Sequence, residues 1–137
     1  MQYIVVFDTN VLISTLLSTA SNPFRCLALA KIRKIESVTC REILNEFSEK
    51  LIVKFKFSQE KTQAAIEEIR SFSRLVEIST ELRVVPADPD DDMVVECAVV
   101  GGATHIVTGD KHLLSLGQYQ KITIIKATEF VALLSQS

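Results

Sequence analysis

Two short apolar runs that each lead into an aspartate constrain the fold more than any other feature of the chain. Residues 3–7 precede Asp8, and residues 105–109 precede Asp110. Both runs are rich in β-branched residues and too short for a helix, which is typical of buried strands. A carboxylate at the end of a buried parallel strand points into the crevice where α/β folds bind ligands. We therefore expect two negative charges close together at one edge of a sheet.

Two adjacent carboxylates are unfavourable, because like charges repel and raise each other's pKa unless a cation neutralises them. Either aspartate alone would be interpreted as a solvated loop residue. The repetition of strand, acid and helical pattern instead favours a site for a divalent metal ion.

Length and composition predict one intracellular globular domain that covers residues 1–137. A chain of this length buries roughly two-thirds of its unfolded surface. The sequence offers no window near the roughly 20 apolar residues of a membrane span, and its first apolar run lacks the basic leader of a signal peptide. Three cysteines, an odd number without C-x-x-C spacing, favour reduced thiols in the cytoplasm. The net charge of −2 does not indicate a nucleic-acid binder, although a bound cation would not be counted in it.

Strand and helix patterns alternate along the chain. Strands are expected at about residues 3–7, 35–38, 75–78, around 107 and at 122–125. Helices are expected at about residues 9–17, 22–33, 39–51, 58–75, 90–100 and 111–116, and from 128 onward. The pairs Thr9–Asn10 and Thr39–Glu42 have the composition of helix caps. Strands separated by helices, without hairpin turns, predict a parallel sheet covered on both faces.

Three segments in this order resemble the motifs of PIN domains: residues 7–14, residues 86–98 and residues 106–114. The resemblance covers nearly the whole chain and is closest to the VapC-like toxins of bacterial toxin–antitoxin pairs. It implies a Rossmann-like three-layer α/β/α fold with a parallel sheet of about five strands. It also implies a nuclease site of three or four carboxylates, with Mg²⁺ or Mn²⁺ as cofactor and RNA as substrate.

Asp8 and Asp110 are the two acids that the motifs place directly in this site. In the middle motif Asp91 lies seven residues before Ala98, as in the family pattern D-x-x-[IV]-x-x-x-A. Its neighbours Asp90 and Asp92 then serve as charges at a helix N-terminus, each stabilising by roughly 0.3–1 kcal/mol.

Two further acids of this segment have open roles. Asp92 is also a candidate supporting ligand. Glu96 is either a surface residue or a support for the ligands.

The remaining ligand has three candidates on one helix: Glu42, Glu46 and Glu49. At 100° per residue, Glu46 lies nearest the centre of the apolar face. Glu42 is assigned to capping, and Glu49 faces away. Glu46 also follows an Ile-Leu pair, as the second acid of PIN domains does, so we select it. The apolar face comprises Ile43, Leu44, Phe47 and Leu51.

Polar and basic residues near these acids complete the expected site. Asn10 and Thr108 either support the ligands or cap local structure. Lys50, Lys54 and Lys56 alternate with apolar residues and are candidate RNA contacts, or else form a solvated basic edge.

The expected function is a metal-dependent endoribonuclease with catalytic carboxylates Asp8, Glu46, Asp91 and Asp110. As partners we expect a small antitoxin protein and a second copy of the chain, in the cytoplasm and away from membranes. The alternative is a metal-binding, nucleic-acid-binding or receiver-like regulatory module without nuclease activity. A receiver would need a regular alternation of strands and helices, which the two consecutive long helices after residue 39 interrupt.

Overall fold

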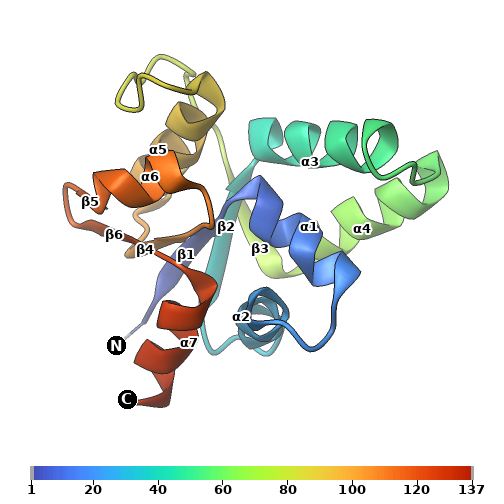
Figure 1. Ribbon diagram of the computed structural model, residues 1–137, viewed down its shortest axis with the longest axis horizontal. Coiled ribbons are helices and arrows are strands. Elements are labelled where there is room, and N and C mark those ends of the chain that lie inside the picture. The colour runs from blue at the N-terminus through green and yellow to red at the C-terminus, as the bar shows by residue number, and fades with distance from the viewer. Residues whose placement is uncertain (1, 137) are drawn as a thin grey trace.

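The computed structural model describes residues 2–136 as one mixed sheet with helices on both faces (Figure 1). The strands are β1 (Ile4–Phe7), β2 (Glu36–Cys40), β3 (Ser73–Val76), β4 (His105–Val107), β5 (Gln118–Tyr119) and β6 (Ile122–Ile125). The helices are α1 (Thr9–Leu17), α2 (Asn22–Lys31), α3 (Arg41–Val53), α4 (Gln59–Phe72), α5 (Pro89–Gly101), α6 (Lys111–Leu116) and α7 (Ala127–Ser135). None of the helices in this part of the chain is long and apolar enough to cross a membrane.

The sheet has the strand order β3-β2-β1-β4-β6-β5, and its first five strands are parallel. The predicted parallel sheet is therefore confirmed over five strands. The expectation of no hairpin is wrong, because β5 pairs antiparallel with β6 across a turn in which Gln120 has a φ of 53°. With only two residues, β5 is too short to give a recognisable pattern.

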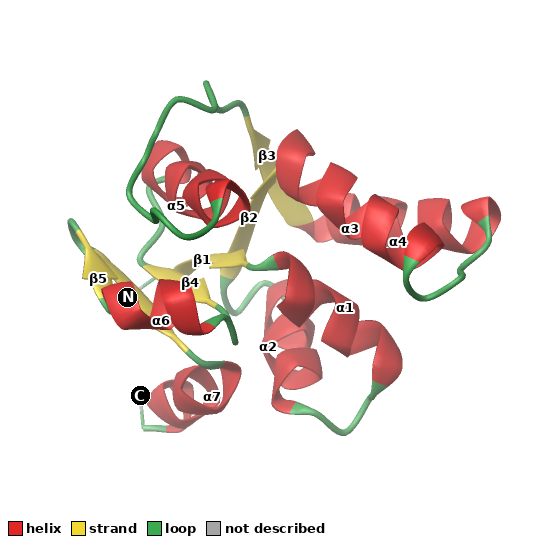
Figure 2. Cartoon of the chain, turned by 45° about the horizontal axis from the view of Figure 1, so that its top comes forward, coloured by secondary structure: helices red, strands yellow, loops and turns green. Residues whose placement is uncertain are grey.

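The helices form two layers around the sheet (Figure 2). Helix α5 packs against β1, β2, β3 and β4, while α1, α2 and α7 pack together on the opposite face. A Cβ atom at Gly101 of α5 would lie 2.5 Å from a Val38 methyl carbon in β2. The helix approaches the sheet this closely because that position carries no side chain.

Two expected helix caps are wrong. Thr39 lies inside β2, opposite Leu75 of β3, and α3 begins at Arg41 with Cys40 as its N-cap. Pairing with strands on both sides outweighs the local capping preference of the threonine. At α1 the N-cap is Asp8 itself, one residue before the expected pair.

The register of the central strands positions the site. Phe7 at the end of β1 lies opposite Val107 at the end of β4, and Val107 lies opposite Ile125 of β6. The residues that follow these strands therefore emerge side by side at the carboxyl edge of the sheet. Two of them continue the pairing, since the Asp8 N–H donates to the Val107 carbonyl at 3.0 Å and the Thr108 N–H to the Ile125 carbonyl at 3.0 Å.

Candidate metal centre

Thr108 connects the two acids at the strand ends. Its hydroxyl donates to one carboxylate oxygen of Asp8 at 2.7 Å and accepts from the Asp110 N–H at 3.0 Å. The other Asp8 oxygen accepts from the Thr9 N–H at 2.7 Å. Asp110 also caps α6, where it accepts from the N–H groups of His112 and Leu113. The predicted neighbourhood of Asp8, Asp110 and Thr108 is thus present in the structure.

Asp91 is the predicted ligand with a buried, unpartnered carboxylate oxygen. Its residue is 5 % exposed, and its Oδ2 atom has no hydrogen-bond partner within residues 2–136. Its pKa is raised to about 7, first by burial and then by repulsion from Asp110 and Asp8. This carboxylate therefore lies among other acids and lacks the partners that would stabilise its charge.

Glu46 reaches the same edge from α3. Its carboxylate accepts from the Thr9 hydroxyl and lies 3.9 Å from the Lys50 ammonium. The pKa of Glu46 is raised to about 7. Burial is the largest cause, the Thr9 hydroxyl opposes it, and the neighbouring Asp90 carboxyl adds to it. Thr9 and Asp90 are contacts that sequence reasoning assigned to capping and to the helix dipole. In the sequence, only the position of Thr9 next to Asp8 and of Asp90 next to Asp91 could have indicated these contacts.

The pKa of Asp8 is raised as well. Burial is the largest cause, opposed by hydrogen bonds from Thr108 and Thr9, while Asp110 raises the pKa further. Three of the four predicted ligands therefore bind a proton more tightly than a solvated carboxylate does.

The three candidate RNA-binding lysines separate in space. The Lys50 ammonium donates to the side-chain oxygen of Asn10 at 3.3 Å, so both residues border the acids. Lys54 and Lys56 are exposed beyond the end of α3, and Lys56 has a φ of 59°. Asn10 thus contacts a cation rather than another carboxylate.

Two of the expected supporting acids hold a loop instead. Asp92 accepts from the backbone N–H groups of Val84 and Val85 at 2.8 and 2.7 Å. Glu96 is buried, so the surface interpretation of it is wrong. Burial acts to raise its pKa, but hydrogen bonds more than offset burial, and the pKa is lowered. Its donors are the Ser79 hydroxyl and the backbone N–H groups of Ser79, Thr80 and Leu82.

The chemistry of the donor set fits a hard divalent cation. Carboxylate and hydroxyl oxygens are the ligands that Mg²⁺ and Mn²⁺ prefer, and the unpartnered Oδ2 atom of Asp91 is available to one. In the described part of the chain, however, no three acidic, histidine or cysteine side chains already lie close enough to enclose an ion. The oxygens of Asp8, Glu46 and Asp110 accept hydrogen bonds from N–H and O–H donors.

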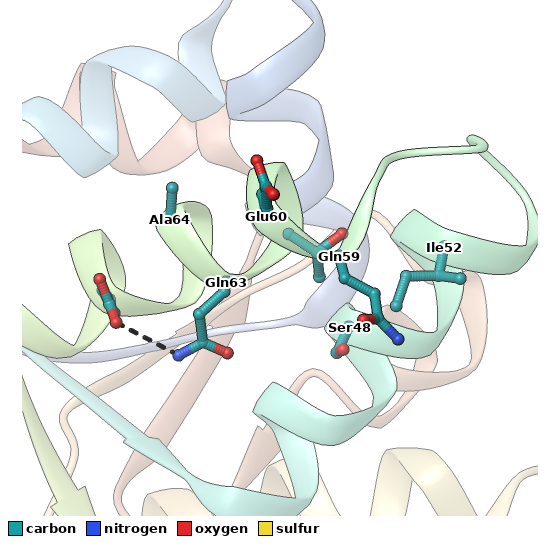
Figure 3. A pocket seen from close by; sticks show the side chains of 8 residues that line it. Ser48, Ile52, Gln59, Glu60, Gln63 and Ala64 are labelled. Carbon is teal, nitrogen blue, oxygen red and sulfur yellow. Dashed lines mark hydrogen bonds between the residues drawn. The ribbon is translucent and has the colours of Figure 1, made fainter.

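A cavity of about 610 Å³ lies away from these acids, between α3 and α4. Ser48 and Ile52 of α3 line it together with Gln59 and Gln63 of α4 (Figure 3). None of the four predicted ligands borders this cavity.

Comparisons with known proteins agree with this architecture. Two solved structures share the fold: VapBC2 from Rickettsia felis bound to a DNA fragment from its promoter, and the PIN domain of T. brucei RRP44. The first is 16% identical, with a TM-score of 0.59 over 88% of this chain and 96% of the other. The second is 11% identical, with a TM-score of 0.56 over 99% of this chain and 83% of the other.

The search of curated proteins gave no significant match. The family model described as the PIN domain matches residues 4–112, which include all four predicted ligands. The chain therefore belongs to the PIN-domain family.

Proposed function

We propose that this PIN domain is a metal-dependent endoribonuclease and the toxin of a toxin–antitoxin pair. The observation that carries the proposal is the buried Asp91 carboxylate, which has an unpartnered oxygen and lies near Asp8 and Asp110. Acids that have strongly shifted pKa values and lie together at one edge of a sheet are typical of functional sites. PIN domains are generally nucleases, and VapBC2 and RRP44 share the fold.

The catalytic carboxylates in this proposal are Asp8, Glu46, Asp91 and Asp110, which would hold Mg²⁺ or Mn²⁺. A divalent cation bound there lowers the pKa of a water molecule and neutralises charge on the phosphodiester. The chain's own contribution is orientation: Thr108 fixes Asp8 relative to Asp110, and Thr9 fixes Glu46. Asp92 and Glu96 hold the loop that precedes α5 and so stabilise the fold around the site.

The proposed substrate contacts are basic. Lys50 lies beside Glu46 and Asn10 and would contact a phosphate near the cleaved bond, whereas Lys54 and Lys56 would contact the strand farther away. Removing phosphate contacts of this kind weakens the binding of all RNA sequences alike and reduces the salt dependence of binding. A small antitoxin, a second copy of the chain and a cytoplasmic location are part of the same proposal.

Digestion of a single-stranded RNA in Mg²⁺, Mn²⁺ or EDTA tests the proposal. Cleavage should require the metal and leave 5′-phosphate and 3′-hydroxyl ends. Metal-dependent RNA binding without cleavage would instead favour the binding-module alternative. Preferential cleavage of duplex DNA would still support the metal site but would contradict the proposal that RNA is the substrate.

A further inference from the structure

A second depression adjoins the acids on the β6 side of the sheet. It has a volume of about 220 Å³ and lies between α1, α2, the segment after β4 and the start of α7. Asn10 and Thr108 connect it to the acidic site, but none of the four carboxylates lines it. Its polar and charged lining comprises Asn10, Ser14, Thr108, Lys126 and Thr128.

Lys126 brings a positive charge to this depression. It directly follows β6, just as Asp8 follows β1, and the two strands flank β4 in the same parallel sheet, so opposite charges lie at one edge. Its backbone N–H donates to the Glu129 carboxylate at 3.1 Å. Its side chain is exposed and forms no ion pair within residues 2–136. The ammonium is therefore available to a ligand.

The neighbouring polar groups add hydrogen-bond donors. Thr128 accepts from the Asn22 amide at 3.1 Å, so its own hydroxyl proton remains free to donate. The side-chain oxygen of Asn10 is taken by Lys50, which leaves the Asn10 NH₂ group as a donor. Ser14 donates to the Asn10 carbonyl at 2.9 Å, so its oxygen can accept a ligand hydroxyl. This combination suits a phosphate joined to a sugar.

Resting on the proposed ribonuclease function, we propose that this depression binds the ribose–phosphate unit next to the cleaved bond, with Lys126 contacting the phosphate. Its volume is below the roughly 300–1,000 Å³ of typical small-molecule pockets, which fits one backbone unit rather than a base as well. Lys126 lies outside residues 4–112, so the matched family segment does not include it.

Binding of a fluorescein-labelled single-stranded oligoribonucleotide in EDTA, measured by anisotropy at several salt concentrations, tests the proposal without requiring turnover. Lys126→Ala should weaken binding several-fold and lower the salt slope by about 0.7, the value for one phosphate contact on a single strand. Lys126→Arg should retain binding. The matched control is Lys121→Ala, an exposed lysine at the opposite end of the same strand, which should bind as the wild type does.

In Mg²⁺, Lys126→Ala should raise KM and leave kcat and metal affinity unchanged. Equal binding by Lys126→Ala and Lys121→Ala would overturn the proposal, even if the wild type cleaves RNA. RNA binding that depends on Lys126 in a protein that does not cleave RNA would support the proposed role of the depression and contradict the nuclease function. A wild type that neither binds nor cleaves would overturn both.

Discussion

Helix α5 carries two kinds of buried carboxylate. Asp91 and Glu96 lie five residues apart and are 5 % and 7 % exposed. Burial acts to raise the pKa of both groups. In Glu96 four hydrogen bonds reverse this effect, whereas in Asp91 other acids add to it and one oxygen has no partner.

The two acids therefore differ in their hydrogen-bond partners and not in their exposure. The Glu96 carboxylate is stabilised by the loop that it holds, and so it needs no ligand. The charged form of Asp91 is destabilised in the metal-free protein, and a cation would relieve that cost. The predictions that follow test this distinction.

The largest expected effect is on activity. Asp8→Asn should reduce RNA cleavage by more than about 100-fold, because loss of a group that merely orients a ligand already costs about 10- to 100-fold. The fold should keep its stability or gain some, since one charge leaves a repelling cluster. Cleavage rates at saturating Mg²⁺ and thermal melting measure the two effects. Near-wild-type cleavage would show that the site is assigned wrongly.

Glu46→Gln should lower cleavage to a similar extent, with Glu49→Gln as the matched control on the same helix. Glu46 contacts Thr9 and lies near Lys50 and Asp90, whereas Glu49 is exposed. Single-turnover cleavage of one RNA by both variants makes the comparison. Equal losses would contradict the choice of Glu46.

A divalent metal ion should stabilise the folded state by binding to the four proposed carboxylates. Binding to the folded state alone adds about 2.7 kcal/mol to the free energy of unfolding at 100 times Kd. Urea unfolding with and without Mg²⁺ should show this gain in the wild type and in Glu96→Gln, but not in Asp8→Asn. A free energy of unfolding unchanged by millimolar Mg²⁺ or Mn²⁺ in the wild type would argue against a metal centre.

Glu96→Gln should have the reverse profile of Asp8→Asn. The amide cannot accept all the donors that the carboxylate accepts, and a buried donor left unpaired costs about 1–3 kcal/mol. Urea unfolding in EDTA should show this loss, while cleavage per folded molecule stays near the wild-type value. A large loss of cleavage in a fully folded variant would place Glu96 in the active site.

Sequence patterns predicted the parallel core and the convergence of Asp8 and Asp110, because a strand that ends in an acid is a local feature. They missed β5, which is too short to show a period, and the true start of α3, where pairing of Thr39 across the sheet overrides its capping preference. They could not separate Asp92 and Glu96 from the predicted ligands. The backbone N–H groups that bind these two acids belong to a loop whose path is set by tertiary packing.

The last expected effect is the pH dependence of stability in the metal-free protein. Asp91 has a pKa of about 7 in the folded state, against 3.8 for an unperturbed aspartate. The folded chain therefore holds this proton more tightly than the unfolded chain, and the resulting stability is lost as pH rises from about 4 through about 7. Glu96 has a lowered pKa, so its contribution is present above the unperturbed value of 4.5 and is lost only in acid.

Asp91→Asn isolates this effect, because the neutral amide resembles the protonated acid. In EDTA its free energy of unfolding should exceed that of the wild type already near pH 5, because the unfolded chain has lost the Asp91 proton there and the folded chain has not. The difference should grow through about pH 7, where Asp91 loses its proton, and level off above about pH 8. Glu96→Gln supplies the contrast, since its deficit should stay constant across the same range. Urea unfolding at four pH values measures both curves. If the difference in free energy of unfolding between Asp91→Asn and the wild type did not change with pH, the pKa of Asp91 would not be raised in the folded state. The distinction between the two carboxylates of α5 would then rest on their hydrogen bonds alone.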